Sequence, residues 1–138
     1  MIAIGPIVER LQAAGCKSVE GVVEFADRTI EPRALPAHFV VPTNESAAPN
    51  RMTGVVDQKI TVGFTIMLAI AAGRSTGAIS EALKTEGDRI KAAIVGWKHP
   101  GATGPTEYAG GQLVSTDARV IAWAFRFTCS YHLRKETQ

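Results

Sequence analysis

The sequence predicts an α+β domain in which a mainly antiparallel sheet carries two helices packed on one face. Two long segments, 55–72 and 117–133, alternate between large apolar and small side chains, which is the period of a strand with one buried face. Two others, 4–14 and 76–97, repeat apolar residues three and four positions apart, which is the period of an amphipathic helix. The order helix, strand, strand, helix, strand, strand favours helices lying against an antiparallel sheet.

Length and composition limit the class of protein. The chain has 138 residues and fits a single domain, 1–138, because a chain of this size can bury a core without disulfides or metal ions. Its 46% hydrophobic and 20% charged residues are ordinary for a globular protein and argue against disorder. The formal net charge of +2 is too small to indicate nucleic-acid binding by charge alone.

No segment of the sequence predicts a membrane span or an export signal. The longest uncharged apolar segment, residues 60–73, has 14 residues, whereas a membrane-spanning helix needs about 20. The first residues lack the basic region and the long apolar stretch of a signal peptide. We therefore expect a soluble, cytoplasmic protein with no membrane partner.

Turn and cap residues set the bounds of the two expected helices. Pro6 fits the first helical turn, where a missing N–H costs nothing, and Gly15 fits a C-cap. Ser75 or Thr76 can cap the start of the second helix with a hydroxyl group. Gly87, inside that helix, is expected to weaken it by about 1 kcal/mol relative to alanine.

Two shorter strands complete the expected sheet. Residues 37–42 form an apolar run that ends at a proline, and residues 106–115 lead through a hairpin into the last long strand. Residues 18–36 are ambiguous because two prolines interrupt them, and the apolar residues between 22 and 26 form either a short helix or a packed loop. The expected core consists of these large side chains: Ile60, Val62, Phe64, Ile66, Leu68, Leu83, Ile90, Ile94, Trp123, Phe125 and Phe127.

The residue types that carry enzyme chemistry form no complete catalytic or metal-binding set. The three histidines lack the spacing of a metal site, and Cys16 and Cys129 lack the CxxC spacing of zinc or redox motifs. The sequence has no glycine-rich phosphate loop. Residues 73–77, GRSTG, match the spacing of the GxSxG nucleophile motif, but Ser75 is better explained as a helix cap. Its scattered carboxylates are compatible with acid–base catalysis, but solvated surface charges explain them better. We therefore expect no catalytic residue, no cofactor and no metal site, and a protein that is not an enzyme.

The two long strands share an unusual feature on the side opposite their large apolar residues. This side, the polar face, carries mostly small side chains, together with Lys59, Thr61, Arg126 and Thr128. A solvated sheet face usually carries more lysine and glutamate. The polar face is therefore a candidate for contact with another subunit or with a polyanion, and an ordinary solvated face is the alternative.

Residues 43–54 form a polar, turn-rich loop that is longer than a hairpin between two strands needs. Its candidate contact residues for another chain are Asn44, Glu45, Asn50, Arg51 and Met52. The planar guanidinium of Arg51 and the adaptable thioether of Met52 suit anchoring contacts. We expect residues 44–53 to be mobile in a free subunit and ordered after assembly; a plain solvated loop is the alternative.

The second half of the chain resembles a known family. Residues 94–135 contain, in order, a helix that ends in GW, a Pro-Gly loop, the stretch EYAGGQL and a last strand with Trp and Phe. This order is similar to the C-terminal part of phage tail terminator proteins from Mu-like phages, prophages and related siphophages. The upstream segments IVERLQAAGC and FVVPTNESAAPNR fit the same family order, so the resemblance covers most of the chain and is weakest at residues 17–36.

The resemblance implies a structural virion protein with a small α+β fold. Such proteins assemble as a hexameric ring that caps the tail tube, ends its polymerisation and forms the surface that joins the head, with DNA passing through the lumen. The expected partners are other copies of the chain, the tail tube protein, a head-completion or connector protein, and weakly and nonspecifically bound DNA. The expected location is the head-proximal end of the tail in a virion that is assembled in the host cytoplasm, and the family supplies no catalytic residue to carry over.

Within this resemblance the polar face has a candidate role. If the two helices cover the apolar face, then the polar face is uncovered and either packs on a neighbouring subunit or lines the lumen. Two other hypotheses remain open. One is a different ring-forming phage protein, such as a head–tail connector or a tube subunit; the other is a small ligand-binding domain, whose mark would be a deep pocket with converging polar groups.

Overall fold

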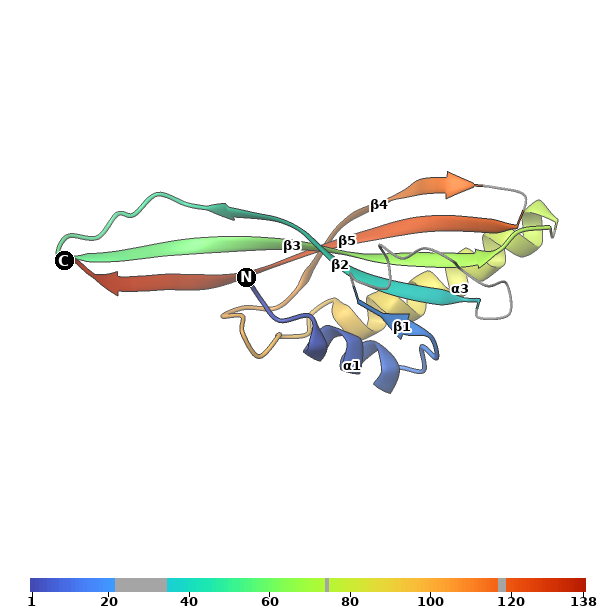
Figure 1. The fold of residues 1–138 in the computed structure, drawn as a ribbon, viewed down its shortest axis with the longest axis horizontal. Coiled ribbons are helices and arrows are strands. Elements are labelled where there is room, and N and C mark those ends of the chain that lie inside the picture. Colours follow the sequence, from blue (N-terminus) through green and yellow to red (C-terminus); the bar gives the residue numbers. More distant parts are fainter. Residues whose placement is uncertain (22–34, 74, 117–118) are drawn as a thin grey trace.

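The computed structural model describes residues 1–21, 35–73, 75–116 and 119–138. Its elements are α1 (Gly5–Ala13), β1 (Val19–Glu20), β2 (Ala37–Ala47), β3 (Val55–Ala71), α3 (Thr76–Ile94), β4 (Glu107–Thr116) and β5 (Val120–Glu136) (Figure 1). The α+β class predicted from the sequence is confirmed. The prediction of a short helix or packed loop between residues 22 and 26 lies outside the described residues.

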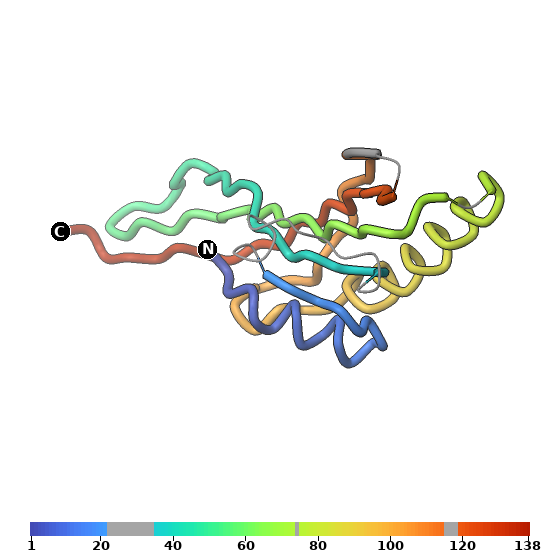
Figure 2. Tube along the Cα trace, turned by 45° about the vertical axis from the view of Figure 1, so that its right-hand side comes forward, coloured from blue at the N-terminus to red at the C-terminus, as the bar shows by residue number. Residues whose placement is uncertain are grey.

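The strands form one five-stranded sheet in the order β1-β2-β3-β5-β4. Each neighbouring pair is antiparallel except the short β1, which runs parallel to β2 and was not predicted. The described helices, α1 and α3, lie on the same side of this sheet (Figure 2). The sheet is therefore mixed but mainly antiparallel, with its helices on one face.

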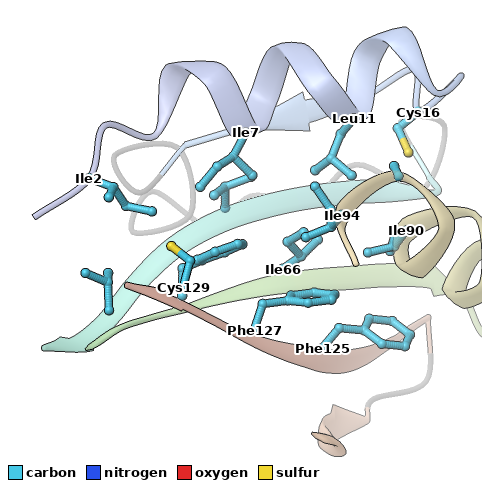
Figure 3. Packing of buried hydrophobic residues seen from close by; sticks show 14 of the residues in the cluster. Ile2, Ile7, Leu11, Cys16, Ile66, Ile90, Ile94, Phe125, Phe127 and Cys129 are labelled. Atoms are coloured by element: carbon cyan, nitrogen blue, oxygen red, sulfur yellow. The ribbon is translucent and has the colours of Figure 1, made fainter. Parts of the chain in front are cut away.

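The main core lies between the helices and the sheet. Figure 3 shows Ile7 and Leu11 of α1 and Ile90 and Ile94 of α3 pointing toward the strands, where Phe127 is fully buried. Burial of such side chains is the main favourable term in folding. Of the predicted core, Leu83 and Trp123 are only partly buried and the others are buried.

Local chemistry explains where α3 begins and ends. The Ser75 hydroxyl oxygen accepts the Ala78 N–H at 3.2 Å, as expected for an N-cap. The helix ends at Ile94 rather than at residue 97, because Val95 is extended and Gly96 has a positive φ of 82°. Gly87 is buried, and a Cβ at this position would lie 2.8 Å from the ring of Phe125. This glycine therefore permits close packing of α3 on β5.

The predicted end of the second strand at Pro42 is wrong. A bulge shifts the register between Pro42 and Asn44, and β2 then continues to Ala47, which pairs with Ile60. Residues 43–47 of the predicted loop are therefore strand. The physical reason is the length of β3: its edge extends beyond Pro42 and supplies backbone partners that hold even polar residues in an extended conformation.

β3 and β5 pair with each other over their whole lengths, from Val55 opposite Glu136 to Ala71 opposite Val120. Figure 1 shows that one end of this ribbon projects well beyond the helices, together with the last part of β2. We call this projection the arm; it comprises residues 43–60 and 131–136. The opposite end of the ribbon, beside α3 and β4, belongs to the body of the domain.

Candidate assembly surfaces

The strand register brings the four predicted polar-face residues onto one surface. Lys59 lies opposite His132, and Thr61 lies opposite Ser130. Thr128 is the next residue of β5 on the same face and lies opposite Gly63. Arg126 lies two residues before Thr128 on β5, so its side chain points to the same side of the sheet. Lys59 and Arg126 are exposed, whereas Thr61 and Thr128 are partly buried.

The expectation that this face is wholly uncovered is wrong for the part within the body. Thr65, Met67 and Ala69 are 6%, 8% and 2% exposed. Met67 and Ala69 belong to a second apolar cluster with Phe39 and with alanines of β2 and β5, against which Leu35, Val41 and Val120 pack. Phe39 lies opposite Met67 in the β2–β3 register. The small residues of this face therefore belong to an apolar cluster with Phe39, and the face is buried there.

A glycine positions Arg126 at the border of the body. Gly110 lies opposite Arg126 in the β4–β5 register, next to a bulge, with a positive φ of 123°. A Cβ on Gly110 would lie 3.2 Å from Arg126 Nη2. The guanidinium group therefore lies close over the glycine backbone, and a larger residue at position 110 would displace it.

The candidate residues Asn44 and Glu45 lie on opposite sides of the arm. Asn44 is opposite Gly63, where a Cβ would overlap the amide oxygen of Asn44. Glu45 instead accepts a hydrogen bond from the Tyr131 hydroxyl group. Its carboxylate also forms an ion pair with the amino group of Met1 at 3.3 Å. The Tyr131 hydrogen bond is the main reason that the pKa of Glu45 is lowered. The two residues therefore do not form one site.

Asn50 has a structural role that the sequence did not reveal. Its side-chain oxygen accepts the N–H groups of Met52 and Asp57 at 3.2 and 3.0 Å. Its amide group donates to the carbonyl oxygens of Met52 and Val55, both at 3.2 Å. The side chain thus occupies backbone groups at the edge of β3, as a paired strand would. Of the other two candidates, Arg51 is exposed and Met52 is 51% exposed.

A small charged cluster lies on the polar side of the arm and was also missed. His132 Nδ1 is 2.9 Å from the carboxylate of Asp57, and Arg134 Nη1 is 3.6 Å from its other oxygen. The two basic residues follow each other on β5 at strand spacing, and Asp57 faces them from β3. Alternation could place each residue on a face, but only the pairing register brings them together.

β4 forms the far edge of the sheet and carries exposed apolar side chains. Tyr108, Leu113 and Val114 are 38%, 52% and 45% exposed. On the arm, Leu133 is 51% exposed. Exposed apolar groups at strand edges are typical of surfaces that bind other chains, and these four residues were not among the predicted contact residues.

The part of the chain that the structure describes holds no group of three or more His, Cys, Asp or Glu side chains arranged to bind a metal ion. Among the same residues, no helix is both long and apolar enough to span a membrane. The accessible groups lie instead on a sheet face, along strand edges and on a projecting arm. Exposed strand edges and a projecting arm are typical of surfaces that bind other chains.

The comparison with known families identifies the structural class. The family model described as phage tail terminator protein matches residues 1–138, so the chain belongs to this family. The resemblance seen in the sequence is thereby confirmed. The chain is a structural component of the phage tail that caps the tail tube, and it is not an enzyme. No curated protein shows a significant match to it.

Proposed function

We propose that six copies of the chain form a ring at the head-proximal end of the tail tube. The ring ends tube polymerisation and presents the surface to which a head-completion or connector protein binds. The family match over residues 1–138 carries this proposal. It is supported by the two kinds of accessible surface on one chain, the arm and the outer strand β4, because a ring needs two unlike surfaces that meet head to tail.

DNA passes through the lumen of this ring, and the exposed part of the polar face faces it. Lys59 and Arg126 provide exposed positive charges there, whereas the neighbouring Thr61 and Thr128 are small and uncharged. A channel of this kind lets DNA slide, because few phosphate contacts give weak and strongly salt-dependent binding. No base-specific contact is required.

The tip of the arm contacts the tail tube or an adjacent subunit. Arg51 and Met52 are both exposed at this tip, and Asn50 holds the backbone beside them. Ordering a loop costs on the order of 1 kcal/mol per residue. Asn50 already fixes part of the loop. Docking of Arg51 and Met52 therefore loses less backbone entropy than docking of a wholly flexible loop would.

Electron microscopy of purified virions tests this function. Virions that carry a tagged copy of the chain should show the tag only at the head-proximal end of the tail, as a ring with six-fold symmetry. Mass measurement of the ring released from tails should give six copies. A tag distributed along the tube would identify a tube subunit instead, and a two-fold symmetric assembly would contradict the ring.

A further inference from the structure

One edge of β5 lacks a partner strand along the arm. β5 pairs with β3 over its whole length, but with β4 only from Ile121 to Thr128. Beyond β4, the backbone N–H of Thr103 donates to the carbonyl oxygen of Ser130 at 2.8 Å. No described residue pairs with this side of β5 between residues 132 and 136, which we call the open arm edge.

The hydrogen-bond pattern identifies the backbone groups at this edge. Alternate residues of a strand direct their N–H and C=O groups to opposite sides. Ser130 directs its carbonyl away from β3, so His132, Arg134 and Glu136 do the same. Thr137, an odd-numbered residue, instead donates its N–H toward β3, to the carbonyl oxygen of Gly54 at 3.5 Å. Three successive outward residues form a template to which a further strand can bind.

The opposite edge of the arm is closed, which makes the open edge distinctive. On that side the N–H of Ala48 donates to the carbonyl of Lys59 at 2.9 Å, and Asn50 occupies the backbone groups of Val55 and Asp57. Proteins usually protect exposed strand edges, because unpaired edges bind other strands. The arm is protected on one edge only.

β4, the last strand in the sheet order, offers a second edge without a described partner, on its side that faces away from β5 (Figure 1). β4 lies on the same side of β5 as the open arm edge. The β5 residues that direct their backbone N–H and C=O groups toward β4 are those of even number. Their partners Gly110 and Gln112 therefore direct these groups toward β5, whereas Gly111 and Leu113 direct them outward. β4 carries no lysine or proline, the residues that commonly block such edges. Its outward side is therefore available for pairing.

We propose that the open arm edge pairs with the outer edge of β4 in a second copy of the chain, so that the sheet continues from one subunit to the next. Charge favours this pairing over that of two identical arm edges. Residues 132–136 contain Arg134, Lys135 and Glu136, a net positive stretch, whereas Glu107 is the one charged residue of β4. Pairing two arm edges would bring like charges together, which is unfavourable.

The proposal rests on the proposed ring and names the strands that join its subunits. Proline substitutions test it, because proline removes one backbone N–H and is tolerated on a strand edge. Arg134→Pro and Leu113→Pro each remove an outward N–H and leave the backbone hydrogen bonds within the subunit in place. Arg134→Ala and Leu113→Ala remove the same side chains but keep the N–H groups, so they are the matched controls.

Each variant is supplied to a phage that lacks its own copy, and rings on purified tails are counted. Each proline variant should form rings about ten-fold or more less often than its matched alanine variant, because only the proline variant also loses one interfacial backbone hydrogen bond. The thermal unfolding of each free subunit shows whether its fold is intact. Normal six-fold rings with both proline variants would overturn the strand pairing and leave the proposed function standing.

Cross-linking on tails identifies the partner edge. Tails are assembled from an equal mixture of Arg134→Cys and Gln112→Cys subunits and treated with a short bis-maleimide reagent. The mixture should give cross-linked dimers, and neither variant alone should. Dimers from Arg134→Cys alone would show that two arm edges pair, and dimers from Gln112→Cys alone would show that two β4 edges pair; either result overturns the proposal. Absence of a ring at the head-proximal end would instead overturn the proposed function.

Discussion

The side-chain oxygen of Asn50 accepts the backbone N–H of Asp57 at 3.0 Å, so one side chain replaces a strand at the edge of β3. We predict that Asn50→Ala speeds amide hydrogen exchange of Asp57 and Met52 and lowers stability by about 1 kcal/mol, the usual net worth of such hydrogen bonds. Asn50→Asp keeps the accepting oxygens but loses both donated bonds, and should have an intermediate effect. Unchanged exchange at Asp57 in Asn50→Ala would contradict this role.

The expectation that residues 44–53 become ordered on assembly stays a prediction. Residues 44–47 are paired with β3, so we expect the change to be concentrated at Arg51 and Met52, near the tip. Hydrogen exchange measured on free subunits and on assembled tails should show slower exchange of these two amides in tails. Equal and fast exchange in both states would rule out docking of the tip.

Phe125 is 4% exposed and packs in the main core. We predict that Phe125→Ala destabilises the fold by about 3–5 kcal/mol, because it removes a large buried ring and leaves a cavity. Chemical denaturation of the free subunit measures the change. Leu133→Ala, at a half-exposed position on the same strand, is the control and should change stability by less than about 1 kcal/mol. A near-neutral result for Phe125→Ala would refute the placement of Phe125 on the buried face of β5.

Gly87→Ala should destabilise the protein, although alanine is the better helix former by about 1 kcal/mol. The added methyl group would lie 2.8 Å from the Phe125 ring, and such overpacking typically costs about 1–3 kcal/mol. The combined variant Gly87→Ala with Phe125→Leu should recover part of the loss, since the smaller side chain makes room. A rise in melting temperature for Gly87→Ala alone would show that the ring moves aside at no cost.

His38 should make the fold less stable in mild acid. Its side chain is 1% exposed, and burial lowers its pKa despite the Ser18 carbonyl at 3.2 Å and the Glu86 carboxylate at 3.6 Å. The unfolded chain then binds a proton at higher pH than the folded chain does, so stability is present above about pH 6.5 and is lost as the pH falls below it.

Denaturation of the free subunit at about pH 7.5 and about pH 5.5 measures this effect, which cannot exceed about 1.4 kcal/mol per pH unit for one proton. His38→Gln keeps a polar side chain that cannot titrate, so its stability should depend less on pH over this range. An equal dependence in both proteins would assign the effect to other groups.

DNA binding by the free subunit should be weak and insensitive to sequence. We expect the double variant Lys59→Ala, Arg126→Ala to weaken this binding further. The slope of log K against log salt concentration should fall by about the amount that two phosphate contacts contribute. Fluorescence anisotropy with two unrelated duplexes at several salt concentrations makes the measurement. Nanomolar, sequence-specific binding at physiological salt would contradict a channel through which DNA slides.

Local sequence patterns were enough to predict which side chains share a face and where the two helices and the two long strands lie, but not the short β1. In a strand, neighbouring side chains always point to opposite sides. The alternation in 55–72 and 117–133 therefore separated Phe127 from Arg126 without knowledge of any partner strand. The same local logic identified the Ser75 cap and both helices. It also placed Lys59, Thr61, Arg126 and Thr128 on one side.

Only the tertiary structure decided what each backbone edge and each buried space meets. The extension of β2 to Ala47, the Asn50 contacts and the open arm edge all depend on hydrogen bonds between segments far apart in the sequence. Likewise, Gly87 reads as a weak helix residue until Phe125 is seen to occupy the space beside it. Periodicity specifies directions within an element, whereas register and packing depend on the relative placement of elements, which no local pattern contains.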